Sequence, residues 1–91
     1  MSVKINIYHS SWRELTKGQT TIEVSGDTTG QCLNHLVKQF PALEKEIFDK
    51  DGKLLNYLSI FVNREIAFPE ELTKPVKDGD ELDIIPIIGG G

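Results

Sequence analysis

Apolar and polar residues alternate with a period of two along several short stretches of the chain. In residues 3–8, Val3, Ile5 and Ile7 lie on one side and polar residues on the other, which is typical of a half-buried strand. Three further stretches show strand-like alternation: residues 20–24, 58–62 and 81–85. The chain is therefore expected to form a sheet with one apolar face.

The segments around these strands carry weaker signals. Residues 10–20 are expected to be a connection that turns at Gly18, so that the first two strands form a hairpin. Residues 64–68 are expected to pair back on the third strand. Pro86 has no N–H to donate, so regular pairing of the last strand should stop there.

One stretch changes its period from two to that of a helix. Its apolar face consists of Leu33, Leu36, Val37 and Phe40. Thr28 followed by Gln31 fits a capping box at the helix start, and Pro41 ends the helix. The order β-β-α-β-β-β predicts an α+β fold of the β-grasp (ubiquitin-like) type, a mixed sheet with one main helix packed across it.

Composition narrows the classes of function. The chain has 91 residues and a formal net charge of −4, with no block of basic residues, which argues against nucleic-acid binding. It has no apolar run long enough for a membrane span and no signal-peptide core, so a soluble, cytoplasmic protein without a membrane partner is expected. One cysteine and two distant histidines give no metal signature, and no phosphate-binding glycine loop is present. We therefore expect no catalytic residue, metal or cofactor in this chain.

Three glycines, Gly89, Gly90 and Gly91, stand directly after an apolar strand. Residues 1–88 are expected to form a single domain, with residues 89–91 as a flexible tail. A tail without side chains can enter a channel too narrow for other residues. Its carboxylate is inert until it is activated, for instance as a mixed anhydride with AMP. Because the chain lacks equipment for that step, another protein would catalyse it, with Gly91 as the reacting residue.

Three segments carry a resemblance to a known family. "VKDGDELDIIPIIGGG" (residues 76–91) resembles the closing segment of the ThiS/MoaD family of ubiquitin-like sulfur carriers, in which a D-G-D turn leads into an apolar strand, a proline and a terminal Gly-Gly. "GDTTGQCLNHLVKQFP" (residues 26–41) and "LSIFVNREI" (residues 58–66) are similar to the family's helix and third strand. Gly89 stands where the family often has alanine.

The resemblance implies a chemistry and a set of partners. An E1-like enzyme would use ATP and magnesium to adenylate the carboxylate of Gly91, and a persulfide donor would convert it to a thiocarboxylate. The sulfur would pass to an acceptor. The length and the extra segment before the third strand resemble the molybdopterin-synthase small subunit or the cysteine-synthesis carrier, so the synthase partner would be a molybdopterin synthase large subunit or a cysteine synthase.

Several other residues are candidates for partner contact. Phe61 and Ile85 are expected on the face opposite the core, with Tyr8 at the edge of an exposed apolar patch. Pro86, Ile87 and Ile88 lead into the tail. Ile87 and Ile88 could be buried in a partner's groove or against this domain, and we expect the partner for at least one of them. Cys32 is expected to be a buried helix residue, although His35 could approach it. No role is assigned to His9, His35 or Trp12.

Two other functions stay open at this point. A ubiquitin-like modifier would use the same activated Gly91 to form an isopeptide bond with a target lysine. A plain interaction module would carry the glycines incidentally. The sequence separates neither these functions nor the two biosynthetic pathways.

Overall fold

The computed structural model describes residues 2–86. Its strands are β1 (Ser2–Ile7), β2 (Thr21–Ser25), β3 (Leu58–Val62), β4 (Glu65–Ile66) and β5 (Glu81–Pro86). Its helices are α1 (Ser10–Leu15), α2 (Thr29–Gln39), the 3₁₀ turn η1 (Pro41–Leu43) and α3 (Glu44–Ile47). None of the helices in this part of the chain is both long and apolar enough to cross a bilayer.

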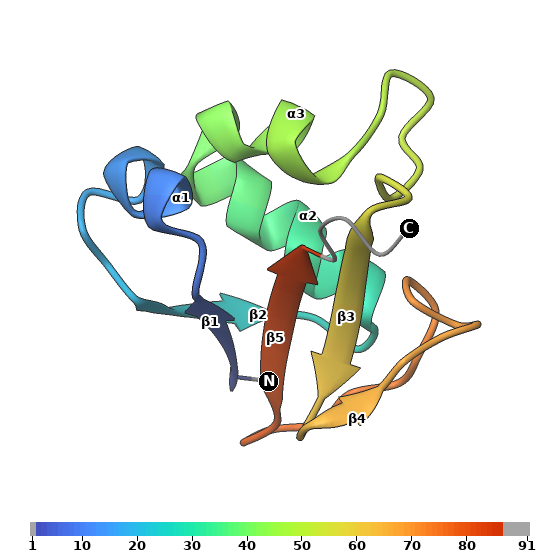
Figure 1. The fold of residues 1–91 in the computed structure, drawn as a ribbon. Helices are drawn as coiled ribbons and strands as arrows, with labels where there is room; N and C mark the ends of the chain where they lie inside the picture. Colours follow the sequence, from blue (N-terminus) through green and yellow to red (C-terminus); the bar gives the residue numbers. More distant parts are fainter. Residues whose placement is uncertain (1, 87–91) are drawn as a thin grey trace.

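The strands form one mixed sheet in the order β2-β1-β5-β3-β4 (Figure 1). β1 and β5 run parallel, and every other neighbouring pair is antiparallel. Residues near the two ends of the chain thus lie side by side at the centre of the sheet. This arrangement, with α2 crossing one face, confirms the predicted β-grasp fold.

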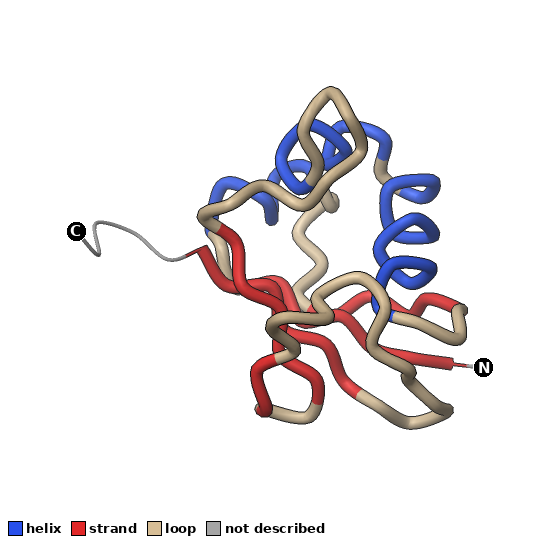
Figure 2. Tube along the Cα trace, turned by 90° about the vertical axis from the view of Figure 1, so that its right-hand side faces the viewer, coloured by secondary structure: helices blue, strands red, loops and turns tan. Residues whose placement is uncertain are grey.

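The helices all cover the same face of the sheet, as the view turned by 90° shows (Figure 2). The alternation in the strands decides which side chains point to them. The predicted inward residues of the strands are nearly or fully buried: Val3, Ile5, Ile7, Ile22, Val24, Leu58, Ile60, Val62, Leu82 and Ile84. Leu33 and Leu36 of α2 complete the core, while Val37 and Phe40 pack at its edge.

The predicted start and end of the main helix are confirmed. The side chain of Thr28 accepts a hydrogen bond from the Gln31 N–H at 3.2 Å. The Gln31 side chain in turn accepts from the N–H of Asp27 at 2.7 Å. In a capping box this second bond goes to the N–H of the cap residue itself, whereas here it goes to the residue before the cap. The helix ends before Pro41, which begins the short turn η1.

The expectation that residues 10–20 are only a connection was wrong, because they contain α1. A helix of six residues is marginal by itself, so local sequence signals it weakly. Trp12 is only 2% exposed, and its indole N–H donates to Glu46 at 3.3 Å. His9, which had no assigned role, caps α1 by accepting from the N–H of Ser11. Gly18 has φ +82° and forms the expected turn after it.

Candidate functional site

The last strand fixes the point from which the glycine end departs. β5 is bonded on both sides, to β1 and to β3, and its Leu82 and Ile84 are fully buried. Figure 1 shows β5 in the middle of the sheet. Movement of this strand would break two ladders at once, so the position of Pro86 is firmly set. The predicted contact and reactive residues Ile87, Ile88, Gly89, Gly90 and Gly91 lie outside the described residues.

Pro86 is the last described residue of β5, so the prediction that regular pairing stops there concerns residues outside the described range. On the β1 side the ladder ends with Ile7 opposite Ile84. On the β3 side the last pair joins Leu58 and Pro86. Because proline lacks the N–H that a further ladder bond to β1 needs, it separates the anchored strand from the residues beyond it.

The turn before β5 is held by two aspartates. Gly79 between them has φ +90°, which suits glycine. Asp78 accepts from the N–H of Ser2 at 2.8 Å. Asp80 is 7% exposed and accepts from the Asn63 side chain at 3.0 Å and from the Lys77 N–H at 2.9 Å. These hydrogen bonds hold the pKa of Asp80 below its usual value. Both aspartates therefore build the turn that leads into β5.

Asp80 gives the protein a predicted acid sensitivity. A carboxylate whose folded pKa is depressed stabilises the fold above its ordinary pKa of about 3.9, and this contribution disappears as pH falls through the folded value. Asp80→Asn should therefore lower the free energy of unfolding by about 1–2 kcal/mol at pH 7 and by less at pH 3, below the ordinary carboxyl pKa of about 3.9. Urea unfolding at both pH values measures this. The exposed Asp51→Asn is the matched control, and an equal loss at both pH values would contradict the expectation.

The outward face of the sheet carries the predicted apolar residues. Ile85 is 36% exposed, Tyr8 is 55% exposed and Phe61 is half-buried. Ile85 lies opposite Ser59, and Phe61 lies opposite Asp83, so the two apolar residues are diagonal neighbours. Ile66, which the sequence analysis did not single out, lies opposite Phe61 and is 53% exposed. We call Tyr8, Phe61, Ile66 and Ile85 the outer apolar patch.

A polar network lies beside this patch, and sequence reasoning missed it. The side-chain amide of Asn6 donates to Glu81 at 3.0 Å and to Asp83 at 2.8 Å. The Tyr8 hydroxyl donates to Asp83 at 3.4 Å, and the charge of Asp83 raises the pKa of Tyr8. With Arg64 these residues line a hollow of about 210 Å³. No local motif signals it, because Asn6 and Asp83 are 77 positions apart.

Cys32 and His35 do not form a reactive pair. Cys32 is fully buried, and burial raises the pKa of its thiol. His35 uses its Nδ1 to accept a hydrogen bond from the Ser25 N–H at 2.7 Å. The prediction of a buried helix cysteine is confirmed. The side chain of His35 instead provides a hydrogen-bond acceptor for the backbone N–H of Ser25 at the edge of β2.

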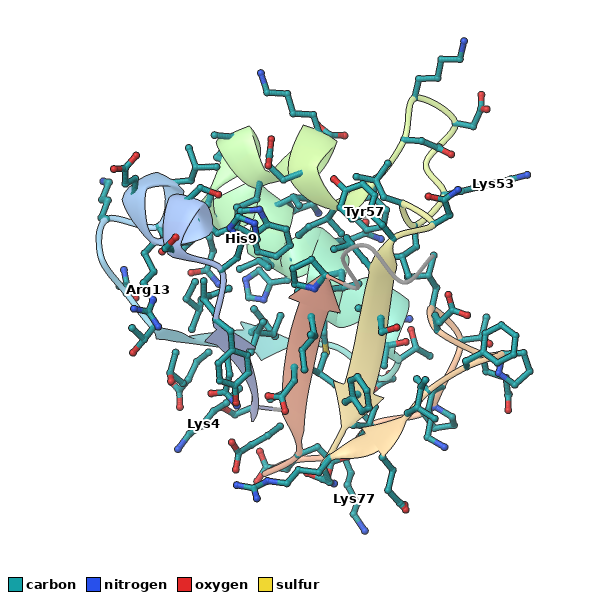
Figure 3. The ribbon with its side chains drawn as sticks, viewed as in Figure 1. Lys4, His9, Arg13, Lys53, Tyr57 and Lys77 are labelled. Carbon is teal, nitrogen blue, oxygen red and sulfur yellow. The ribbon has the colours of Figure 1, made fainter. Side chains whose placement is uncertain are left out.

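The cations labelled in Figure 3 are spread over the molecule. Lys4 and Lys77 lie near the lower end of the sheet, Arg13 beside α1, and Lys53 on the loop after α3. These four charges form no common basic surface. The face that joins the outer apolar patch to Glu81 and Asp83 also carries Arg64, so it is apolar with charges of both signs at its border.

Comparison with known proteins gives consistent results. The model of the ThiS family matches residues 7–91. The sulfur carrier protein CysO of Mycobacterium tuberculosis is 33% identical over 82 residues, which cover 87% of this chain and 88% of that protein. The small archaeal modifier protein 1 (SAMP1) of Haloferax volcanii is 39% identical over 71 residues, covering 77% of this chain and 78% of that protein.

A solved structure shows the same similarity in three dimensions. The structure of the Amycolatopsis orientalis BexX/CysO complex contains a chain that superimposes with a TM-score of 0.85 at 28% identity. The match covers 98% of this chain and 99% of that one. The β-grasp arrangement described above is therefore that of the sulfur-carrier and modifier proteins.

Proposed function

This chain belongs to the ThiS family, and from that premise we propose that it is a sulfur carrier whose cargo is held as a thiocarboxylate on Gly91. The proposal rests on the short distance in sequence between a buried strand and the glycines. Ile84 is fully buried at the centre of the sheet, and Gly89 follows Pro86 by three positions. A rigid scaffold would thus present a carboxylate that no side chain shields.

The carrier chemistry needs two steps at the Gly91 carboxylate. An E1-like enzyme first joins the carboxylate oxygen to the α-phosphorus of ATP, with magnesium, and releases pyrophosphate. A persulfide sulfur then attacks the carbonyl carbon, and AMP leaves with the C–O electron pair. The product is an acyl disulfide. A second thiolate attacks the donor's sulfur in that bond and forms a new disulfide, which releases the thiocarboxylate.

Support for placing the catalysis in a partner comes from the nucleophiles of the described residues. The thiol of Cys32 is buried with a raised pKa, and His35 is already hydrogen-bonded to Ser25. Neither is placed to activate a carboxylate. The E1-like enzyme would supply ATP binding, and the carrier would supply the tail.

We infer that the outer apolar patch docks on this enzyme or on the sulfur-accepting synthase. The patch lies on the uncovered face of the sheet, beside the strand that leads to the tail. Asp83, Glu81 and Arg64 border it, so a partner surface with apolar side chains and polar groups at its rim would complement it. Pro86, Ile87 and Ile88 would continue this contact toward the partner's active site.

The docking proposal predicts a substitution that affects binding and leaves folding intact. Ile85→Asp adds a charge at an exposed position, so we expect it to raise the Kd for the activating enzyme about 10-fold or more. The free energy of unfolding should fall by about 1–2 kcal/mol, because aspartate is disfavoured in a strand, and the domain should stay folded. Calorimetric titration and urea unfolding measure the two effects. Lys50→Asp, an exposed charge change on a distant loop, is the control; equal losses from both variants would remove the patch from the interface.

The similarity to CysO favours cysteine biosynthesis as the destination of the sulfur, with a cysteine synthase as acceptor. Molybdopterin synthesis is the second possibility within the same chemistry. The acceptors differ in the nucleophile that receives sulfur, and the carrier's own step is common to both.

The similarity to SAMP1 favours a second function, that of a protein modifier. In that case a lysine amine of a target would attack the same activated carbonyl. AMP or a thiol would leave, and an isopeptide bond would join Gly91 to the target. Both functions need a free, reactive glycine end.

One experiment separates carriage from modification. The protein is incubated with the E1-like enzyme, ATP, magnesium and sulfide, and intact masses are recorded. Replacement of one oxygen by one sulfur at the C-terminal residue is the expected result for a carrier. Conjugates of higher mass, with a glycine remnant on lysine after digestion, identify a modifier. An unchanged mass with an enzyme that activates a related carrier would contradict both.

A further inference from the structure

The turn between β3 and β4 has an unusual residue at its second position. Val62 pairs with Glu65, so the loop between the two strands consists of Asn63 and Arg64 alone. Both residues have a positive φ, 50° for Asn63 and 71° for Arg64. A two-residue hairpin loop with two positive φ values is a type I′ turn, for which Asn-Gly is the favoured sequence. Arg64 therefore stands where glycine would be the relaxed choice.

The left-handed conformation of Arg64 is imposed by its neighbour in the turn. The Asn63 N–H donates to the Glu81 carbonyl at 2.9 Å. The Asn63 side chain donates to Asp80 at 3.0 Å and accepts from the Glu81 N–H at 3.0 Å. These three bonds fix the turn against the start of β5. No hydrogen bond within residues 2–86 uses the Arg64 side chain, so the arginine does not hold the turn in place.

The backbone at Arg64 thus carries a cost that its side chain does not offset within the fold. A left-handed conformation is unfavourable for a residue with a Cβ, and glycine adopts it freely. Strained backbone of this kind is concentrated at functional sites, where the side chain is needed for something other than folding. The place of Arg64 indicates what that is, because its side chain is exposed and lines the hollow on the outer face of the sheet.

This hollow carries opposite charges toward its two sides. Glu81 and Asp83 of β5 accept from the side-chain amide of Asn6, which belongs to β1. Arg64 enters from the other direction, since β3 and β4 follow β5 in the strand order. A partner's carboxylate would be attracted at the Arg64 side and repelled at the β1 side. The charge pattern therefore distinguishes one docking orientation from the reversed one.

Arg64 also lies far from the end of the strand that leads to the glycines. β5 begins at Glu81, which is bonded to the turn, and ends at Pro86. Five residue steps of about 3.3 Å place these two ends about 17 Å apart. Figure 1 shows the turn at the lower end of the sheet and the tip of β5 at the upper end. Phe61 and Ile85 of the outer apolar patch lie between the two ends.

We propose that Arg64 binds a carboxylate of the activating enzyme and thereby fixes the orientation in which the carrier docks. The proposal rests on the carrier function proposed above. Apolar contact is non-directional, so the outer apolar patch by itself would permit rotation on the partner's surface. A guanidinium pairs with a carboxylate through two parallel hydrogen bonds, which adds direction to the contact. Because this contact lies at the opposite end of β5 from Pro86, it sets the direction in which the strand points.

Replacing Arg64 with glycine should weaken binding and strengthen the fold. At about 0.05 M salt we expect the Kd for the activating enzyme to rise about 5-fold or more, and the difference from the parent chain should shrink at about 1 M salt, where charges are screened beyond about 3 Å. The urea midpoint should rise, because glycine relaxes the turn. Calorimetric titration at both salt concentrations and urea unfolding measure these effects. A residue with only a structural role would not move the two readouts in opposite directions.

Lys17→Gly is the matched control. Lys17 is also exposed and also has a positive φ, 58°, but it follows α1 and is not part of the outer face. Its replacement removes the same single charge and relaxes the same kind of backbone. The urea midpoint should rise as in Arg64→Gly, whereas the Kd should stay within about 2-fold of the parent value. Arg64→Lys keeps the charge, and its Kd should stay within about 3-fold.

Three results would overturn the proposal. An unchanged Kd in Arg64→Gly would remove Arg64 from the interface. A lower urea midpoint in this variant would show that the arginine offsets Glu81 and Asp83 within the fold, so that any loss of binding is structural. An equal loss of affinity in Lys17→Gly would show only an effect of net charge. Thiocarboxylate formation by the parent chain, measured by mass, is a separate readout: normal loading with an unchanged Kd in Arg64→Gly contradicts this inference alone, and binding that depends on Arg64 without any loading contradicts the carrier function alone.

Discussion

Replacing Gly90 with valine is expected to reduce thiocarboxylate formation about 100-fold or more while the fold stays intact. In the proposed function the tail passes through a channel in the activating enzyme that is matched to a bare backbone. A branched side chain next to the reacting residue would displace the Gly91 carbonyl, and misplacement by about 1 Å can cost about 100-fold in rate. The initial rate of sulfur incorporation, followed by intact mass, measures the effect.

Gly89→Ala is the matched control for this prediction. It adds a single methyl group two positions before the reacting residue, at the place where the resembling family often has alanine. We expect it to retain the rate within a few-fold. Urea unfolding of both variants should match that of the parent chain, because the changes lie beyond Pro86, the last residue of β5. A Gly90→Val variant that still forms thiocarboxylate at the parent rate would remove the basis for the threading proposal.

Replacing Ile84 with alanine is expected to produce the largest loss of stability, about 3–4 kcal/mol. Ile84 is fully buried on the central strand, between Ile7 of β1 and Ile60 of β3. Truncation removes buried apolar surface and leaves a cavity that a two-sided sheet position cannot close easily. Domains are typically stable by about 5–15 kcal/mol, so the variant should remain folded at 25 °C with a much lower urea midpoint.

Ile85→Ala separates the two faces of the same strand. Ile85 is adjacent in sequence but points away from the core and is 36% exposed. Its truncation should cost about 1 kcal/mol, less than at Ile84, because 36% of its surface stays in water and no cavity opens in the core. Partner binding should show the reverse order, with the larger loss at Ile85. Similar stability losses at the two positions would contradict the assignment of faces.

The strands and their inward faces could be predicted because every second side chain of a strand points to the buried face of the sheet, which gives the apolar–polar alternation in the sequence. Val3 and Ile5 point inward in any register that covers one face of the sheet. The helix limits followed from local chemistry at Thr28 and Pro41. The helix α1 was missed, since its stability comes from burying Trp12 rather than from its own short sequence.

The candidate site was only partly predictable. Phe61 and Ile85 were placed on the outward face by alternation, and the structure puts them on neighbouring strands. Ile66 joined them only through the register of β4 with β3. The proposed roles of Gly89, Gly90, Gly91, Ile87 and Ile88 come from chemistry and resemblance, and they remain predictions to be tested by the experiments above.

The sequence by itself determined the strands and the main helix. It also determined the short distance in sequence between the last strand and the glycines, and the family. These features depend on side chains that are close together in the chain. Only the tertiary structure decided that Asn6 meets Asp83, that Asp80 meets Asn63, and that Ile66 lies opposite Phe61. The physical reason is that each of these contacts joins distant segments through strand pairing, whose partners and register are set by burial of the whole sheet and not by any local pattern.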